Sequence, residues 1–223
     1  MNILGFDTST KLLPIVLGNE KGVLAACDID SYIKHSAMII PSIIRLLKKS
    51  RFKKEDIDVV AVGLGPGSLT GIRVGLATAK GLCVGLNRPI LGICSLDIIA
   101  QNVNEADVDI CPLIDAKRSL VFSAIYRRCR GRFRRIRPPR ISSIEEVLSC
   151  VNSDVVFLGD GVGIYKDIIK RKIKKSYFVA ERDWYPRAEN ILKTALLYKD
   201  KKKPCKDNLN PIYLYPKECQ VRR

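Results

Sequence analysis

Residues 62–75 require a strand, a tight turn and a helix in immediate succession; their sequence is V-G-L-G-P-G-S-L-T-G-I-R-V-G. The run Ile57–Val62 that leads into them is short, β-branched and nearly all apolar, as a strand buried on both faces would be. Glycine relieves the steric limits on the turn, and Ser68 or Thr70 can cap the helix. The free N–H groups and the positive end of the helix dipole attract a phosphate or a carboxylate, although a tight turn without a ligand explains the same residues. The candidates for anion binding are Gly65, Gly67, Ser68 and Thr70.

Three strand-like runs precede this segment, at residues 3–6, 13–17 and 23–29, and their polar turns predict an antiparallel meander. A helical stretch, the strand before the glycines and a further short strand follow. This is the order of one half of the α/β fold shared by actin, Hsp70 and sugar kinases (the ASKHA fold), so we predict two lobes with mixed β-sheets flanked by helices. The first hairpin turn of that fold faces the nucleotide phosphates, which makes Asp7, Thr8 and Ser9 candidates for contact with phosphate or a Mg²⁺-bound water. The same side chains also stabilise a hairpin turn that has no ligand.

The charge of the chain is unevenly distributed. The formal net charge is +16, with 12 Lys and Arg against 8 Asp and Glu in residues 1–100 and 27 against 15 in residues 101–223. A polar, acidic stretch at 102–109 marks the boundary, so we predict an N-terminal ASKHA-like lobe at 1–100 and a smaller, strongly basic lobe at 101–223. Such a positive field favours polyanionic partners.

The location of the chain follows from its cysteines and its apolar runs. Eight cysteines are scattered without a C-x-x-C pair, which indicates reduced thiols. No uninterrupted apolar stretch reaches the roughly 18 residues that span a bilayer, and residues 1–7 lack the features of a signal peptide. We therefore expect a cytoplasmic protein that does not contact membranes.

Two helices of the first half, at 34–50 and 68–86, are more apolar than a surface helix needs to be. In the second, Gly71, Gly75 and Ala79 recur every fourth residue, which allows another backbone to approach closely. We expect a partner protein to cover these helices; burial between a sheet and a neighbouring helix is the alternative. Pro41 predicts a bend or a late start in the first helix. The predicted interface residues are Met38, Ile39, Ile43, Leu46, Leu47, Gly71, Arg73, Val74, Gly75, Thr78, Ala79 and Leu82.

Residues 127–140 contain eight arginines and no acid, with Gly131 at the expected tip of a hairpin. Guanidinium groups bind phosphate oxygens, and Phe133 can stack on an unpaired base, so this segment is a candidate RNA-binding site. A solvated hairpin whose charges keep its edge from pairing with other chains is the alternative. The candidate RNA contacts are Arg128, Arg130, Arg132 and Arg134.

Groups for catalysis are few. His35 is the only histidine, which excludes a His-His metal pair and a Ser-His-Asp triad, and a lone histidine at a helix start is usually structural. We predict no catalytic residue and no metal site in this chain.

The combined motifs resemble the TsaB family, formerly YeaZ, of bacterial tRNA threonylcarbamoyladenosine biosynthesis proteins. The similarity begins at Ile3–Thr10, includes His35, and is most specific at Gly65–Gly75. Residues 112–117 resemble the family's I-D-A-R element with Lys117 in place of arginine. Residues 211–214 resemble its P-x-Y-L-R ending, in which Tyr215 replaces the arginine.

The resemblance implies an ASKHA fold and a supporting role beside TsaD, the paralogue that transfers a threonylcarbamoyl group to A37 of tRNAs reading ANN codons. TsaD binds its metal through an H-x-x-x-H motif, whose positions fall here on Ser95 and Ile99, so this chain is expected to be a non-catalytic scaffold. The implied partners are TsaD in a heterodimer, TsaE as a further member, tRNA indirectly or through the basic lobe, and a second copy of the chain when it is alone. No cofactor is required by this chain, while ATP and Mg²⁺ act at the level of the complex.

Two enzymatic alternatives remain: a nucleotide-hydrolysing ASKHA enzyme, and an inactive relative of a metal-dependent peptidase. ATP turnover by the isolated chain would favour the first. On the scaffold hypothesis, Ile43→Glu or Leu76→Glu is expected to abolish the heterodimer without unfolding the chain.

Overall fold

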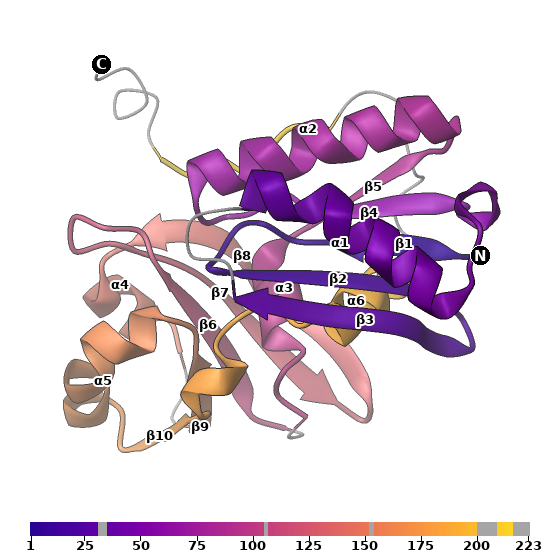
Figure 1. Ribbon diagram of the computed structural model, residues 1–223. Helices are drawn as coiled ribbons and strands as arrows, with labels where there is room; N and C mark the ends of the chain where they lie inside the picture. Colours follow the sequence, from indigo (N-terminus) through magenta and orange to yellow (C-terminus); the bar gives the residue numbers. More distant parts are fainter. Residues whose placement is uncertain (31–34, 105–106, 152–153, 200–208, 216–223) are drawn as a thin grey trace. The chain divides into compact units, whose positions relative to one another are not determined.

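The computed structural model describes residues 1–30, 35–104, 107–151, 154–199 and 209–215 (Figure 1). The chain divides into two compact units, one formed by Met1–Ile98 and Tyr185–Pro211, the other by Ile99–Trp184 and Ile212–Arg223. The sequence-based division at residue 100 lies close to the first crossing, but it assigns 185–211 to the second lobe. The structure differs there because helix α6 (Ala188–Lys199) buries its apolar face on the first unit.

The first unit contains a five-stranded mixed sheet in the order β3-β2-β1-β4-β5. Its strands are β1 (Ile3–Phe6), β2 (Leu12–Asn19), β3 (Gly22–Asp30), β4 (Val59–Gly63) and β5 (Ile90–Ile93). The first three pair antiparallel, and β4 and β5 continue the sheet in parallel with β1. Every residue of β1, β4 and β5 is buried, which confirms the prediction of a buried strand before the glycines.

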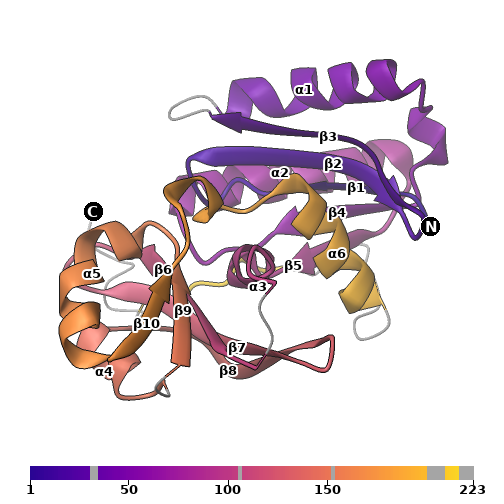
Figure 2. The same ribbon diagram turned by 90° about the horizontal axis from the view of Figure 1, so that it is seen from below.

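Helices cover both faces of this sheet. Helix α1 (His35–Ser50) contacts β2 and β3, and α2 (Leu69–Leu86) contacts β4, β5 and α1. Helix α6 packs on the opposite face, where its Ile191 and Leu192 meet Ile3, Val16 and Leu91. Figure 2 shows α6 in front of the strands and α2 behind them. Helix α1 continues through Pro41 from His35, so the late start is not observed.

By length and composition α2 is apolar enough to cross a membrane. One of its faces is nevertheless part of the core of the first unit. The buried residues of this face are Gly71, Ile72, Gly75, Leu76, Ala79 and Cys83. Burial on one side is typical of a core helix in a globular protein.

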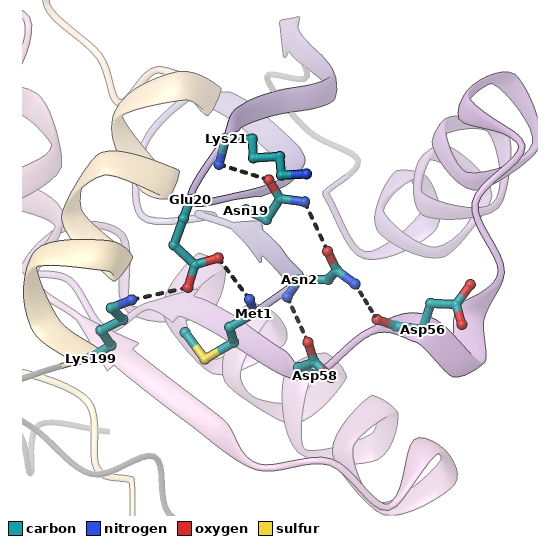
Figure 3. A network of polar contacts seen from close by, with 8 residues as sticks. All are labelled: Met1, Asn2, Asn19, Glu20, Lys21, Asp56, Asp58 and Lys199. Carbon is teal, nitrogen blue, oxygen red and sulfur yellow. Dashed lines mark hydrogen bonds and ion pairs between the residues drawn. The ribbon is translucent and has the colours of Figure 1, made fainter.

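A polar network joins the two ends of the first unit (Figure 3). The terminal ammonium of Met1 donates a 2.7 Å hydrogen bond to Glu20 in the β2–β3 turn. The other carboxylate oxygen of Glu20 accepts one of 3.0 Å from Lys199, the last residue of α6. Asn2 accepts from Asn19 and donates to the carbonyl of Asp56. The start of β1, the hairpin turn and the end of α6 are therefore held together by side chains.

The second unit repeats the strand order of the first. Its strands are β6 (Asp109–Asp115), β7 (Val121–Cys129), β8 (Arg132–Ser142), β9 (Asp154–Leu158) and β10 (Lys175–Phe178), in the order β10-β9-β6-β7-β8. Strands β6, β7 and β8 are antiparallel, and β9 and β10 run parallel to β6. Helices α4 (Ile144–Leu148) and α5 (Gly161–Lys172) join one face in a common core. Of the short elements, η1 (Lys54–Asp56) belongs to the first unit and η2 (Glu181–Asp183) to the second, while α3 (Ser95–Ala100) contains the point at which the chain passes from one to the other. Two mixed sheets with flanking helices confirm the predicted fold class.

Candidate functional site: the β1–β2 turn, an apolar helix face and an arginine hairpin

The β1–β2 turn and the glycine-rich segment meet at the carboxylate of Asp7, which is fully buried. Its Oδ1 accepts a 2.6 Å hydrogen bond from the backbone N–H of Ser9. Its Oδ2 accepts one of 2.6 Å from the hydroxyl of Ser95, the first residue of α3. That hydroxyl also accepts from the N–H of Gly65 at 3.1 Å. Ser95 thus joins two predicted phosphate-binding residues, Asp7 and Gly65, and Asp7 in turn binds a third, Ser9. Both oxygens of Asp7 already accept hydrogen bonds from the protein.

Thr8 packs against the first turns of α2. Its hydroxyl donates a 2.7 Å hydrogen bond to the carbonyl of Gly71. A Cβ at Gly71 would collide with the carbonyl oxygen of Thr8, and one at Gly75 would collide with its hydroxyl. The small residues of α2 therefore admit the chain's own hairpin turn. The sequence pattern predicts a close approach by another backbone, and in the structure that backbone belongs to the same unit.

Of the two predicted caps, Ser68 and Thr70, it is Ser68 that caps α2. Its hydroxyl accepts a 3.2 Å hydrogen bond from the N–H of Gly71, while its own N–H donates to the carbonyl of Ser9 at 2.8 Å. Gly67 lies so close to Ser9 that a Cβ would collide with the same carbonyl. Part of the helix N-terminus is therefore occupied by the hairpin turn. Thr70 is exposed and takes no part in the cap.

Two hydroxyls of the turn, Ser9 Oγ and Thr10 Oγ1, are buried without a hydrogen-bond partner in the part of the chain that the structure describes. Buried hydroxyls normally have a partner, so a small polar ligand or a water would satisfy them. Nucleotide binding by the β1–β2 turn and the glycine-rich segment stays a prediction.

The predicted partner interface divides into buried and accessible residues. Six of its members pack inside the first unit: Ile39, Ile43, Leu46, Gly71, Gly75 and Ala79. Their inclusion was wrong, because one stripe of α1 faces β2 and β3 and one face of α2 lies against the β1–β2 turn and β4. Leu76, named as a test position, is also buried. Of the rest, Arg73 is exposed, and Met38, Leu47, Val74, Thr78 and Leu82 are half-buried.

Four large apolar residues that the interface prediction omitted are exposed on the same helices. Ile40 and Ile44 of α1 are 40% and 47% exposed, and Leu69 and Val84 of α2 are 47% and 79% exposed. The sequence does contain a signal for the exposed residues of α1: Ile40, Ile44 and Leu47 form an apolar stripe of helical spacing. This stripe lies beside the buried one formed by Ile39, Ile43 and Leu46. Helices α1 and α2 contact each other and run side by side in Figure 1. Together they present an apolar surface.

The β7–β8 hairpin has its tip at Arg130 and Gly131, as predicted. Arg128 is not available to RNA, because it donates a 2.9 Å hydrogen bond to Gln101 and its guanidinium lies 5.4 Å from the ring centroid of Phe133. Phe133 in turn stacks on Tyr126, with ring centroids 5.2 Å apart. The predicted base-stacking role of Phe133 is therefore not supported, since its ring already has an aromatic partner.

The remaining candidates, Arg130, Arg132 and Arg134, are exposed. With Cys129 they line a hollow of about 520 Å³. Farther along the strand, a hydrogen bond from Arg140 holds the pKa of the Cys150 thiol below its usual value. The hairpin is therefore strongly cationic over most of its length.

Comparisons with known proteins cover nearly the whole chain. The family model described as "TsaD: tRNA N6-adenosine threonylcarbamoyltransferase" matches residues 30–215. The tRNA threonylcarbamoyladenosine biosynthesis protein TsaB of Bacillus subtilis is 30% identical over 228 residues, which span 100% of this chain and 97% of that protein. TsaB of Haemophilus influenzae is 28% identical, with 96% and 93% covered. The solved structure of YeaZ from Pseudomonas aeruginosa is 25% identical and superposes with a TM-score of 0.84, covering 96% of this chain and 99% of that one.

Proposed function

Because the chain belongs to the TsaB family of tRNA threonylcarbamoyladenosine biosynthesis proteins, we propose that it is a non-catalytic subunit in the formation of N6-threonylcarbamoyladenosine at position 37 of tRNAs reading ANN codons. In this role it binds and activates a TsaD-type transferase. The exposed apolar surface of α1 and α2 is the observation that carries the proposal.

This surface has the composition of a protein interface. Ile40 and Ile44 lie one turn apart on α1, and Leu69 and Val84 lie on the exposed side of α2. Large apolar side chains that two neighbouring helices leave exposed mark a site of association, since covering them removes apolar area from water. The half-buried Leu47, Val74 and Leu82 enlarge the surface. A homologous ASKHA subunit offers a matching pair of helices to cover it.

The buried contacts of Ser95 support the non-catalytic assignment. Ser95 and Ile99 occupy the positions where the resemblance places the metal-binding histidines of TsaD, and both are buried. The hydroxyl of Ser95 is engaged by Asp7 and Gly65, which gives it a structural task. Neither a serine hydroxyl in this state nor an isoleucine replaces an imidazole ligand.

The rest of the assignment follows from the family. TsaD is the partner in a heterodimer, TsaE is a further member of the complex, and a second copy of this chain covers the apolar surface when TsaD is absent. The complex acts in the cytoplasm. This chain requires no cofactor of its own, and ATP and Mg²⁺ act at the level of the complex.

The test is coexpression with TsaD of the same organism, followed by copurification and sizing chromatography. The variant Ile44→Glu/Val84→Glu changes only exposed side chains and is expected to lose TsaD while keeping its circular dichroism. Ile164→Glu is the matched control, because Ile164 is a 57% exposed isoleucine on α5 of the other unit. Copurification of TsaD with the double variant would contradict the proposal.

The nucleotide-hydrolysing alternative rests on one observation, the unpartnered hydroxyls of Ser9 and Thr10 beside the start of α2. It predicts that the isolated chain binds ATP with Mg²⁺ in a calorimetric titration and that Ser9→Ala weakens this binding. The absence of heat with the wild-type chain would remove this alternative.

A further inference from the structure

The exposed arginines of β8 form a row on one face of an edge strand. Strand β8 ends the sheet order, so it pairs only with β7 among the described strands. In the ladder, Arg132 lies opposite Cys129 and Arg134 opposite Arg127. Residues directly opposite each other in an antiparallel pair share a face, and alternate residues along a strand share it as well. Arg132 and Arg134 therefore point to the same side.

A bulge extends this row. Tyr126 lies opposite Arg135, but the next pair is Ile125 with Arg137, so β8 carries one extra residue at this point. Ile125 shares its face with Arg127 and Cys129 because all three alternate along β7. The bulge thus brings Arg137 to the face of Arg132 and Arg134. Without the extra residue, Arg137 would be on the opposite side.

This face carries charge that the protein does not neutralise. Arg127 is paired, since its Nε donates to Asp109 at 2.8 Å. In contrast, Arg130, Arg132 and Arg134 make no ion pair with any residue in the described ranges, although all line the same hollow. Like charges gathered around one hollow repel one another, so an anion that enters it is bound favourably.

The chemistry of the face selects among anionic partners. A membrane surface is held by apolar side chains inserted between the cations, and a protein interface has aromatic or aliphatic anchors at its centre. Neither is present among the residues that the ladder places on this face: Ile125 is buried, and Phe133 points to the other side and stacks on Tyr126. Ile136 is 53% exposed, but it is the extra residue of the bulge and has no residue opposite it on β7. Guanidinium groups alone match phosphate oxygens in bidentate geometry.

We propose that Arg130, Arg132, Arg134 and Arg137 bind the sugar-phosphate backbone of an RNA. The proposed function enters only in the choice of a tRNA as the RNA to test. Because Phe133 is engaged within the chain, the contacts are to phosphates and carry no base readout. Binding is therefore independent of RNA sequence and depends steeply on salt.

The experiment measures binding of the full chain to an unmodified tRNA transcript by fluorescence anisotropy between 50 and 200 mM salt. Arg130→Ser/Arg132→Ser/Arg134→Ser is expected to weaken binding at least tenfold, and to lower the slope of log K against log salt by about 2 to 3 for three lost phosphate contacts. The matched control, Lys170→Ser/Arg171→Ser/Lys172→Ser, removes the same charge from exposed positions at the end of α5. It is expected to change the affinity less than threefold.

Three results would overturn the proposal: equal losses in the two triple variants, no loss in the arginine variant, or a loss of binding to anionic vesicles without a loss of RNA binding. If the triple variant does not fold, Arg132→Ser and Arg134→Ser are measured singly. Arg132→Lys keeps the charge but not the bidentate geometry and is expected to bind at an intermediate level. Copurification of TsaD separates the two proposals: the arginine variant is expected to retain TsaD, whereas Ile44→Glu/Val84→Glu is expected to lose TsaD and still bind RNA.

Discussion

The hydroxyl of Ser95 donates a 2.6 Å hydrogen bond to Oδ2 of Asp7, and neither residue is exposed to solvent. Asp7→Ala removes the acceptor of Ser95 and of the Ser9 N–H while leaving both donors buried. We expect the free energy of unfolding to fall by about 2 to 4 kcal/mol. Urea denaturation measures it, with the exposed Thr70→Ala as the control. A loss below about 0.5 kcal/mol for Asp7→Ala is the range of an ordinary surface substitution. Such a result would contradict the role of Asp7 as the buried acceptor of Ser95 and Ser9.

The glycines of α2 differ in what surrounds them. Gly71→Ala places a Cβ against the Thr8 carbonyl, so we expect a loss of about 1 to 3 kcal/mol from overpacking. Gly81→Ala in the same helix meets no atom within 4 Å and is expected to stabilise by about 0.5 to 1 kcal/mol through helix propensity. Thermal and urea unfolding of the two variants test this opposite sign. Equal effects would show that the Thr8 contact is not a constraint.

Adjacent isoleucines of α1 are expected to respond differently to a charge. Ile43 is buried, so Ile43→Glu places an unpaired carboxylate in the core and is expected to cost at least about 3 kcal/mol. Ile44 is exposed, so Ile44→Glu is expected to stay within about 0.5 kcal/mol of the wild type. The measurement is the urea midpoint of each variant at a protein concentration at which sizing chromatography gives the monomer. Similar midpoints would contradict the burial of Ile43, and the reverse order would show that the two stripes of α1 are exchanged.

The network in Figure 3 predicts a pH dependence of stability. Hydrogen bonds to Glu20, above all from the terminal ammonium, lower its pKa from 4.5 to about 2. A carboxylate with a lowered folded-state pKa stabilises fully above its unfolded value, and this contribution is lost as the pH falls from 4.5 towards 2. The stability difference between wild type and Glu20→Gln should therefore shrink over that range. Glu55→Gln is the control, because the carboxylate of Glu55 is exposed and lies 3.9 Å from the ammonium of its neighbour Lys54.

Two cysteines of the second unit are expected to differ in reactivity. The hydrogen bond from Arg140 lowers the pKa of Cys150, so more of its thiol is ionised at neutral pH. Burial raises the pKa of Cys111, which keeps that thiol protonated. We expect iodoacetamide to label Cys150 and not Cys111, and Arg140→Gln to slow the labelling of Cys150 several-fold. Peptide mass mapping follows both sites, and an unchanged rate in the variant would contradict the role of Arg140.

Much of the first unit was predictable from local patterns. The buried strand before the glycines, the turn and the cap at Ser68 follow from residues that are adjacent in the chain. Strand β10 was not predicted, because its residues K-S-Y-F have no apolar alternation and become a strand through pairing with β9.

The surfaces were harder to predict because a shift of one residue changes the face. Both Ile39 with Ile43 and Ile40 with Ile44 have helical spacing, and only the contacts of α1 with β2 and β3 decide which pair is buried. Along β7 and β8, the register decides that Arg128 faces Phe133 while Arg132 and Arg134 lie on the other side. Such choices depend on neighbours distant in sequence, which composition and periodicity do not specify.

Along the sequence, residues 99–184 stand between the two segments of the first unit, since α6 returns to the sheet on which the chain began. A gene fragment that stops near residue 98 therefore encodes five strands without their second cover, and Ile3, Val16 and Leu91 face water. The polypeptide leaving the ribosome passes through the same state, so the first strands reach their final packing only after residues 99–184 and α6 have been synthesised.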